Sequence, residues 1–227
     1  MDSGSHNSIS PTEENYLKAI FKITAGAGLA STNAIAQEME TSPASVSDMI
    51  KRLSRKHLID YEKWKGVSLT KEGRILAITL IRRHRLWEVF LVEKLHFAWD
   101  EVHEIAEQLE HIASEKLIER LDEFLGTPKF DPHGDPIPDA EGIFAKRKQV
   151  LLSELNALET GVIVGVHEHS TAFLQYLDRM DLVLGAVLKV QEIFEYDGSM
   201  RIELENKTSL VLSSKVSQHL FVQRQKP

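Results

Sequence analysis

The chain has 227 residues, of which 27% are charged, and its formal net charge at pH 7 is -7. It contains no cysteine, which excludes disulfide bridges, zinc fingers and thiolate catalysis. No apolar run reaches the roughly 20 residues needed to cross a bilayer, and the first residues lack the features of a signal peptide. We therefore expect a cytoplasmic, non-membrane protein with two or three small domains.

The charge is unevenly distributed along the chain. A net negative charge ordinarily counts against nucleic acid as a partner, because binding to a polyanion needs a positive field. Basic residues nevertheless outnumber acidic ones between residues 51 and 85, whereas acidic residues concentrate between residues 88 and 123. This asymmetry predicts a basic part that faces DNA and an acidic part that attracts cations.

Three helix starts occur in the first quarter of the chain. Ser10-Pro11-Thr12-Glu13 combines a capping serine, a proline at the first helical position and a glutamate three residues after the cap. Ser31 or Thr32 caps a second helix, and Ser42-Pro43 begins a third. Alternating segments at 58–63 and 67–70 then flank a glycine-containing turn, which predicts a hairpin. Residues 1–72 are thus expected to form a winged helix-turn-helix domain.

The next segment, 73–142, is expected to form an all-helical second domain. A long helix running to about Leu95 has more apolar surface than it needs to pack on the core of its own domain along one apolar stripe. This predicts packing on a second subunit and therefore a homodimer. The expected capping and terminating residues are Thr70, Asp100, Ser114 and Gly126. The proline-rich segment 127–142 is expected to be a linker or a pinned loop.

Short strands at close spacing fill the remaining segment, 143–227. They predict a small β-barrel of about 75 residues. The expected fold class is therefore mainly α with a small β part.

Six titratable residues share helix faces in the middle segment, because they are three or four positions apart. They are His84, Glu88, His103, Glu107, Glu110 and His111. One such pair is usually only an exposed ion pair, but a whole set on one face needs a cation to gather it. Imidazole and carboxylate without thiolate favour Mn²⁺ or Fe²⁺, and Zn²⁺ or Co²⁺ would be expected to bind in vitro.

The order of these features resembles the diphtheria-toxin-repressor family of iron- and manganese-dependent transcriptional repressors. The similarity extends from about Ser10 to Val222, and its specific motifs are His84-Arg85-Leu86-Trp87-Glu88, the segment 102–111 and the Pro-His-Gly loop of residues 131–138. The resemblance implies a winged helix-turn-helix, a helical metal-binding and dimerisation domain, and a terminal SH3-like, FeoA-type β-barrel.

The resemblance also implies two metal positions. The primary, activating ligands would be Glu107, Glu110 and His111, with Asn15 from the first helix. The ancillary ligands would be His84, Glu88 and His103, completed by Glu168 or His169 from the barrel.

Three positions depart from the family pattern. Asn15 stands where members of the family carry methionine or aspartate, and its neutral oxygen is a weaker ligand than an aspartate. Glu107 replaces the cysteine of iron-responsive members, which favours manganese. Lys18 replaces the second glutamate of short manganese sensors, so their closely spaced binuclear cluster is not expected.

The resulting hypothesis is a metal sensor and not an enzyme. Bound metal would act as co-repressor by fixing two winged helices over successive major grooves of a palindromic, double-stranded operator. Base edges would be approached by Ser42, Ala44 and Asp48. Phosphate or sugar would be held by Thr12, Ser45, Ser47, Arg52, Arg55, Trp64 and Lys65.

Two other functions remain open at this point. A metal-dependent hydrolase would also use His and Glu clusters, although no separate nucleophile or oxyanion turn accompanies them. A winged-helix regulator of a non-metal effector would carry the same residues as an ion-pair network.

Overall fold

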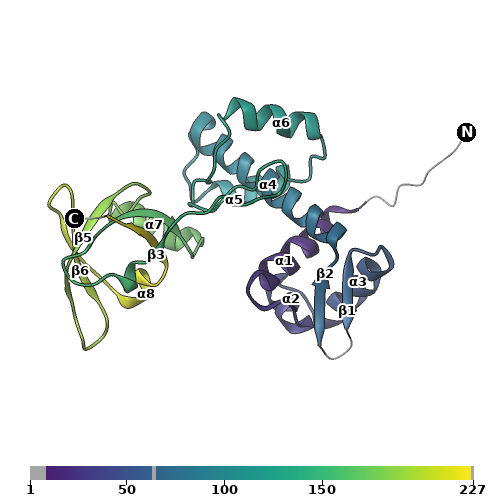
Figure 1. The fold of residues 1–227 in the computed structure, drawn as a ribbon, viewed down its shortest axis with the longest axis horizontal. Coiled ribbons are helices and arrows are strands. Elements are labelled where there is room, and N and C mark those ends of the chain that lie inside the picture. The colour runs from purple at the N-terminus through teal and green to yellow at the C-terminus, as the bar shows by residue number, and fades with distance from the viewer. Residues whose placement is uncertain (1–8, 63–64, 226–227) are drawn as a thin grey trace, which may run out of the picture. The chain divides into compact units, whose positions relative to one another are not determined.

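The computed structural model describes residues 9–62 and 65–225, without the side chains of residues 26 and 27. These residues divide into two compact units. The first unit contains the described residues up to His84 together with Leu109–Ala113 and Pro138–Ile143. The second contains Arg85–Gln108, Ser114–Ile137 and the described residues from Phe144 onward. Figure 1 shows the elements of both units.

The first unit begins with three helices, α1 (Pro11–Ala27), α2 (Thr32–Glu38) and α3 (Pro43–Arg55). A serine caps each of them, because its side-chain oxygen accepts a hydrogen bond from the backbone N–H three residues later. The caps are Ser10, Ser31 and Ser42, as the sequence predicts, with Ser31 and not Thr32 at the second helix. Local sequence therefore determines where all three helices begin.

The predicted hairpin is confirmed as the antiparallel pair β1 (Ile59–Glu62) and β2 (Gly66–Leu69). Lys63 and Trp64 lie outside the described residues. Ala30 and Val67 exchange two backbone hydrogen bonds of 2.8 and 2.9 Å, which attach the wing to the α1–α2 connection.

A buried ion pair ties α1 to the end of α3. Glu13 is 2% exposed, and its carboxylate accepts a hydrogen bond of 2.9 Å from the Lys56 ammonium, while also closing the capping box with Ser10. Around this pair the helices bury fully apolar side chains, including Leu17, Ile35 and Leu53. The winged helix-turn-helix predicted from the sequence is thus confirmed, with α1 and α3 fixed against each other.

The middle of the chain contains α4 (Lys71–Leu95), α5 (Val102–Leu109) and α6 (Glu115–Phe124). The division between the two units falls inside α4, after His84. Asp100, predicted to cap α5, instead accepts a hydrogen bond of 2.8 Å from the Gln175 side chain. Large apolar side chains remain exposed on these helices, among them Ile75, Leu95, Leu117 and Phe124.

The last part of the chain is a six-stranded antiparallel sheet with the order β3-β8-β4-β5-β6-β7. Its strands are β3 (Val150–Leu151), β4 (Thr160–Val166), β5 (Val187–Ile193), β6 (Met200–Leu204), β7 (Ser209–Leu212) and β8 (Leu220–Arg224). The 3-10 turn η1 (Leu152–Glu154) directly follows β3, and α7 (Thr171–Arg179) and α8 (Ser214–Ser217) complete the domain.

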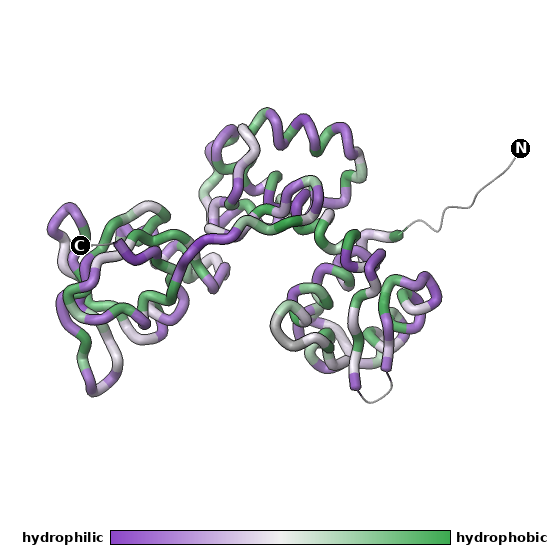
Figure 2. The backbone as a smooth tube through the Cα atoms, in the orientation of Figure 1, coloured by the Kyte–Doolittle hydropathy of each residue, from purple (hydrophilic) through white to green (hydrophobic). Residues whose placement is uncertain are grey.

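The strands enclose a continuous apolar core with fully buried residues such as Ile163, Val190 and Leu220. Figure 2 shows how hydrophobic residues recur along these strands, whereas the segment that leads into β3 is hydrophilic. Among the described residues, no helix combines the length and the hydropathy required to cross a bilayer.

The proline-rich segment is a pinned loop. One carboxylate oxygen of Asp131 accepts hydrogen bonds from the backbone N–H groups of His133 (2.9 Å) and Asp135 (3.0 Å). Arg147 donates to the carbonyls of Gly134 (2.8 Å) and Val164 (2.5 Å). The loop is therefore held against β4 of the sheet, within the second unit.

Gly134 is required where the loop meets β4. Its φ is +87°, and a Cβ at this position would lie 2.2 Å from the Val164 carbonyl oxygen. We expect Gly134→Ala to lower the free energy of unfolding by about 3 kcal/mol, because left-handed strain and a backbone clash add together. Urea denaturation of the metal-free protein measures this.

Gly185→Ala is a matched control, since Gly185 has a φ of +88° but nothing within 4 Å of its added Cβ. It should cost only the conformational strain, about 1 kcal/mol. Equal losses of stability in the two variants would contradict the close packing of the loop on β4.

Candidate metal centre

The first unit contains a cluster around Glu110, the residue that follows α5. The Glu110 side chain is fully buried and is contacted by two basic residues, Lys18 and His84. The Lys18 ammonium donates to both of its oxygens, at 2.6 and 2.9 Å, and His84 Nδ1 lies 2.6 Å from Oε2. Burial by itself would raise the pKa of Glu110, but the hydrogen bond with His84 and the charge of Lys18 bring it below its ordinary value. Glu110 is therefore ionised and already compensated.

A second acid–base pair joins Glu14 of α1 to His111, which follows Glu110 in the chain. His111 Nδ1 is 2.6 Å from the Glu14 carboxylate, and Arg83 approaches the other Glu14 oxygen at 3.8 Å. The side-chain oxygen of Asn15 is buried and has no hydrogen-bond partner among the described residues. A buried oxygen without a hydrogen-bond partner is a feature that suits a cation.

Of the four predicted primary ligands, Glu110, His111 and Asn15 belong to the first unit, and Glu107 belongs to the second. One contact of Glu107 is with His103, four residues earlier on α5, at 3.7 Å. The neighbours Lys18 and Glu14 were not predicted as parts of this site.

The second unit contains a group of three buried side chains, Glu88, Asp131 and His133. One potential ligand atom from each lies within 4.8 Å of the others, an arrangement that can hold a metal ion. The Asp131 pKa is raised to about 7 by burial and by the negative charges of Glu88 and Asp135. Carboxylates that repel one another in this way are gathered at a cost unless a cation lies between them.

The orientation of the His133 ring is fixed by a backbone carbonyl. Its Nε2 lies 2.8 Å from the Trp99 carbonyl oxygen, which can only accept, so Nε2 carries a proton. Nδ1 consequently faces Glu88, at 3.6 Å. Burial opposes the charged form, but Glu88 and Asp131 raise the His133 pKa to about 9. A histidine held by one nitrogen and presenting the other is the usual arrangement of a metal ligand.

Of the two barrel candidates, His169 and not Glu168 faces this group. The His169 ring stacks on that of His133 with centroids 4.9 Å apart, and its Nε2 is buried without a partner among the described residues. Burial also lowers its pKa, which favours the neutral, electron-donating form. Glu168 instead accepts a hydrogen bond from the Ser170 backbone N–H and so closes its own turn.

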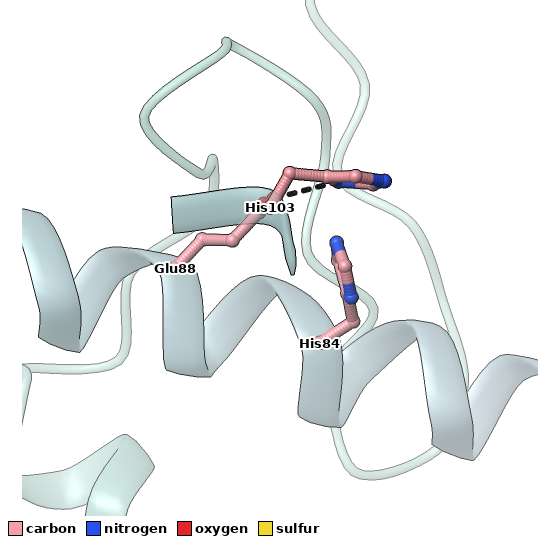
Figure 3. Close-up of side chains that lie close together, drawn as sticks. All are labelled: His84, Glu88 and His103. Atoms are coloured by element: carbon pink, nitrogen blue, oxygen red, sulfur yellow. Dashed lines mark hydrogen bonds and ion pairs between the residues drawn. The ribbon is translucent and has the colours of Figure 1, made fainter. Parts of the chain in front are cut away.

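The three predicted ancillary ligands also lie close together, as Figure 3 shows. One ligand atom each of His84, Glu88 and His103 lies within 4.8 Å of the others, and His103 Nδ1 is 3.4 Å from Glu88. Helical spacing explains this, because His84 and Glu88 are one turn apart on α4. Among the described residues these two groups of three are the ones found, and both contain Glu88.

Asp131 and His133 were not predicted as ligands. The signal was present, because an acid and a histidine two residues apart occur in a loop that proline keeps from being regular. What the sequence does not show is that this loop folds back onto α4, where Arg85 binds Asp135 at 2.9 Å.

The surface expected to face DNA is the exposed side of α3. Ser42, Ala44, Asp48, Arg52 and Arg55 are all exposed. Ser45, Thr12 and Lys65 are exposed as well, whereas Ser47 is half-buried and its hydroxyl donates to the Pro43 carbonyl at 2.8 Å. Trp64 lies outside the described residues.

Three family models match consecutive parts of the chain. Residues 8–67 match the N-terminal DNA-binding domain of iron-dependent repressors, and residues 70–139 match the metal-binding and dimerisation domain of the same family. Residues 150–224 match the FeoA domain.

Individual relatives show the same similarity. The iron-dependent repressor IdeR of Mycobacterium leprae is 33% identical over 164 residues, which are 70% of this chain and 71% of that protein. IdeR of Mycobacterium bovis is 35% identical over 132 residues, 58% of this chain, and the match spans little more than half of that protein, 57%. A solved manganese-dependent transcriptional repressor in complex with manganese has a TM-score of 0.83 and 32% identity, with 94% of this chain and 100% of that chain covered.

The raised pKa of His133 gives a test of the buried group in the metal-free protein. We expect Glu88→Gln to bring this pKa from about 9 down toward its ordinary value, because the glutamine removes the negative charge and leaves only a neutral, weaker hydrogen-bond acceptor for the imidazolium. NMR titration of the ring C–H signals measures it. In the unaltered protein, the stability contributed by charged His133 should be complete below pH 6.5 and lost as the pH rises through about 9.

Glu93→Gln removes an exposed carboxylate from the same helix and should leave the His133 titration unchanged. An unaltered His133 pKa in Glu88→Gln would mean that the two side chains do not interact as described.

Proposed function

Because this chain belongs to the family of iron- and manganese-dependent transcriptional repressors, we propose that it represses transcription by binding DNA as a homodimer when Mn²⁺ or Fe²⁺ is bound. The observation that carries this proposal is the buried group Glu88, Asp131 and His133, with the unpartnered Nε2 of His169 beside it. The family consists of transcription regulators, so a hydrolase function is not proposed.

The first proposed metal position uses Glu88, Asp131, His133 and His169. Bound there, the metal would add positive charge to a group in which Glu88 and Asp131 repel each other and have His133 and Arg85 as their protein partners. The Trp99 carbonyl holds the His133 ring so that Nδ1 is presented, and the backbone N–H groups of the loop hold Asp131. Carboxylate and imidazole ligands favour the binding of Mn²⁺ or Fe²⁺, and they would also bind Zn²⁺ or Co²⁺ in vitro.

The second proposed position uses Glu110 and His111, with Glu107 and the Asn15 side-chain oxygen. Its support is that Glu110 is buried and ionised and that Asn15 has an acceptor without a partner among the described residues. His84, which contacts Glu110, would serve at this position, and His103, which contacts Glu88, would serve at the first.

The DNA-binding part of the proposal is supported by the exposed residues of α3 and by the fold. A symmetric homodimer places two copies of α3 on a two-fold axis, so the operator is proposed to be palindromic. Exposed apolar side chains such as Phe124 and Leu95 support a dimer interface. The domains are proposed to span residues 1–72, 73–142 and 143–227, and a regulator of transcription is proposed to act in the cytoplasm.

A regulator that responds to a non-metal effector is the alternative. The buried group would then be only an ion-pair network that stabilises the loop. Two atoms favour metal binding over this alternative, the Nε2 of His169 and the side-chain oxygen of Asn15. Neither has a hydrogen-bond partner among the described residues, and an ion-pair network would give neither a role.

Metal dependence is tested by fluorescence-anisotropy titration of a palindromic operator. We expect binding to be at least about 100-fold tighter with Mn²⁺ or Fe²⁺, added anaerobically, than with a chelator, which is within the usual range of coupling between sites. Glu88→Gln should weaken the metal response, and Glu93→Gln should not. Equal affinity with metal and with chelator would contradict the proposal and favour a non-metal effector.

Phosphate contacts by α3 are tested by the salt dependence of the same binding. Each phosphate contact contributes roughly 0.9 to the slope of log K against log salt concentration, so Arg52→Ala should reduce the slope by about two in a homodimer. Lys189→Ala removes an exposed charge from β5 and should leave the slope unchanged. A slope in Arg52→Ala equal to that of the unaltered protein would remove Arg52 from the interface.

A further inference from the structure

Lys18 places a positive charge directly on a proposed metal ligand. Its ammonium lies 2.6 and 2.9 Å from the two oxygens of Glu110, and both residues belong to the first unit. We propose that Lys18 is a tethered cation that occupies Glu110 when no metal is bound, and that a divalent metal must displace it to use this carboxylate. The inference rests on the proposed function and assigns to Lys18 the role of setting the metal affinity of this position.

The geometry identifies Lys18 as the member of the pair that moves. The Glu110 side chain is fully buried, whereas that of Lys18 is 21% exposed and ends in a flexible four-carbon stem. The ammonium can therefore rotate into water, where its charge is well solvated. Glu110 cannot follow, and a buried carboxylate that loses one of its two basic partners and keeps only His84 is costly. Displacement of Lys18 thus requires another cation to take its place.

Asn15 provides the second observation. It lies three positions before Lys18 on α1, so both residues are on one face of the helix. Its side-chain oxygen is buried without a hydrogen-bond partner among the described residues, although Lys18 has three N–H donors. The ammonium therefore compensates Glu110 but leaves this acceptor unused. A metal ion has several coordination positions, so it can bind a carboxylate oxygen of Glu110 and the side-chain oxygen of Asn15 at the same time.

The arrangement has a consequence for affinity. A competing cation attached to α1 is always present at high effective concentration, so it weakens metal binding without any change in the ligands themselves. The position would therefore respond only at a higher free metal concentration than its ligands alone would set.

The test compares Lys18→Met with Lys22→Met in a Glu88→Gln background, which disables the other proposed position. Lys22 lies on the next turn of α1 and binds the exposed Glu38, so its replacement removes the same charge from the same helix away from Glu110. Mn²⁺ affinity is measured by competition with a fluorescent chelator. We expect Lys18→Met to raise the affinity about tenfold or more, and Lys22→Met to change it less than about twofold.

A purely structural role for Lys18 would give the opposite sign, because damage to the site lowers metal affinity. Lys18→Arg keeps the charge and should keep the low affinity. Thermal denaturation gives a second readout: metal-free Lys18→Met should melt below the Glu88→Gln parent, and Mn²⁺ should raise its melting temperature by more than it raises that of the parent. Lys18→Gln replaces the methionine variant if the latter does not fold.

Equal Mn²⁺ affinities in Lys18→Met and Lys22→Met would overturn the inference. So would a failure of both variants to bind Mn²⁺, because Glu110 would then take no metal. In either case the proposed function stands if the unaltered chain still binds its operator in a metal-dependent way. If the unaltered chain binds neither Mn²⁺ nor Fe²⁺, the proposed function and the role of Lys18 both fail.

Discussion

The compensation of buried carboxylates is the constraint on which this structure depends. Four acidic side chains among the described residues are buried, Glu13, Glu88, Glu110 and Asp131. Removing such a charge from water costs several kcal/mol unless a cationic group accompanies it. Their partners are, in the same order, Lys56, His133, Lys18 and Arg85. Each pair joins segments that are distant along the chain, so the requirement for neutrality also determines which segments pack together.

Features that depend on neighbouring residues were predictable from the sequence. Ser10, Ser31 and Ser42 begin their helices because capping needs only a side-chain oxygen and a backbone N–H three residues later. The hairpin, the end of α6 before Gly126 and the alternating strands follow the same local rules. The similarity to known repressors, inferred from the order of motifs, is confirmed by the family models over residues 8–67, 70–139 and 150–224.

Features that depend on tertiary contacts were not predictable. Helical spacing places His84 and Glu88 one turn apart on α4, but it gives no information on a loop that returns from elsewhere in the chain. Asp131 and His133 therefore escaped prediction, and Asp100 was assigned to a helix cap although Gln175 of the barrel binds it. Lys18 was seen only as a departure from a family pattern, because the sequence does not show that its ammonium reaches Glu110, 92 positions away.

The pair between Glu13 and Lys56 has a mechanical consequence. Glu13 lies only one helical turn before Lys18, and it holds the C-terminal end of α3 through a buried contact of 2.9 Å. If α1 moves as a rigid helix, a tilt of α1 at Asn15 and Lys18 also moves α3, because the Glu13–Lys56 pair connects the two helices. An ångström-scale change in the packing of α1 on residues 109–113 would therefore change the orientation of α3, the helix that is proposed to contact DNA. Neither helix would have to unfold for this change.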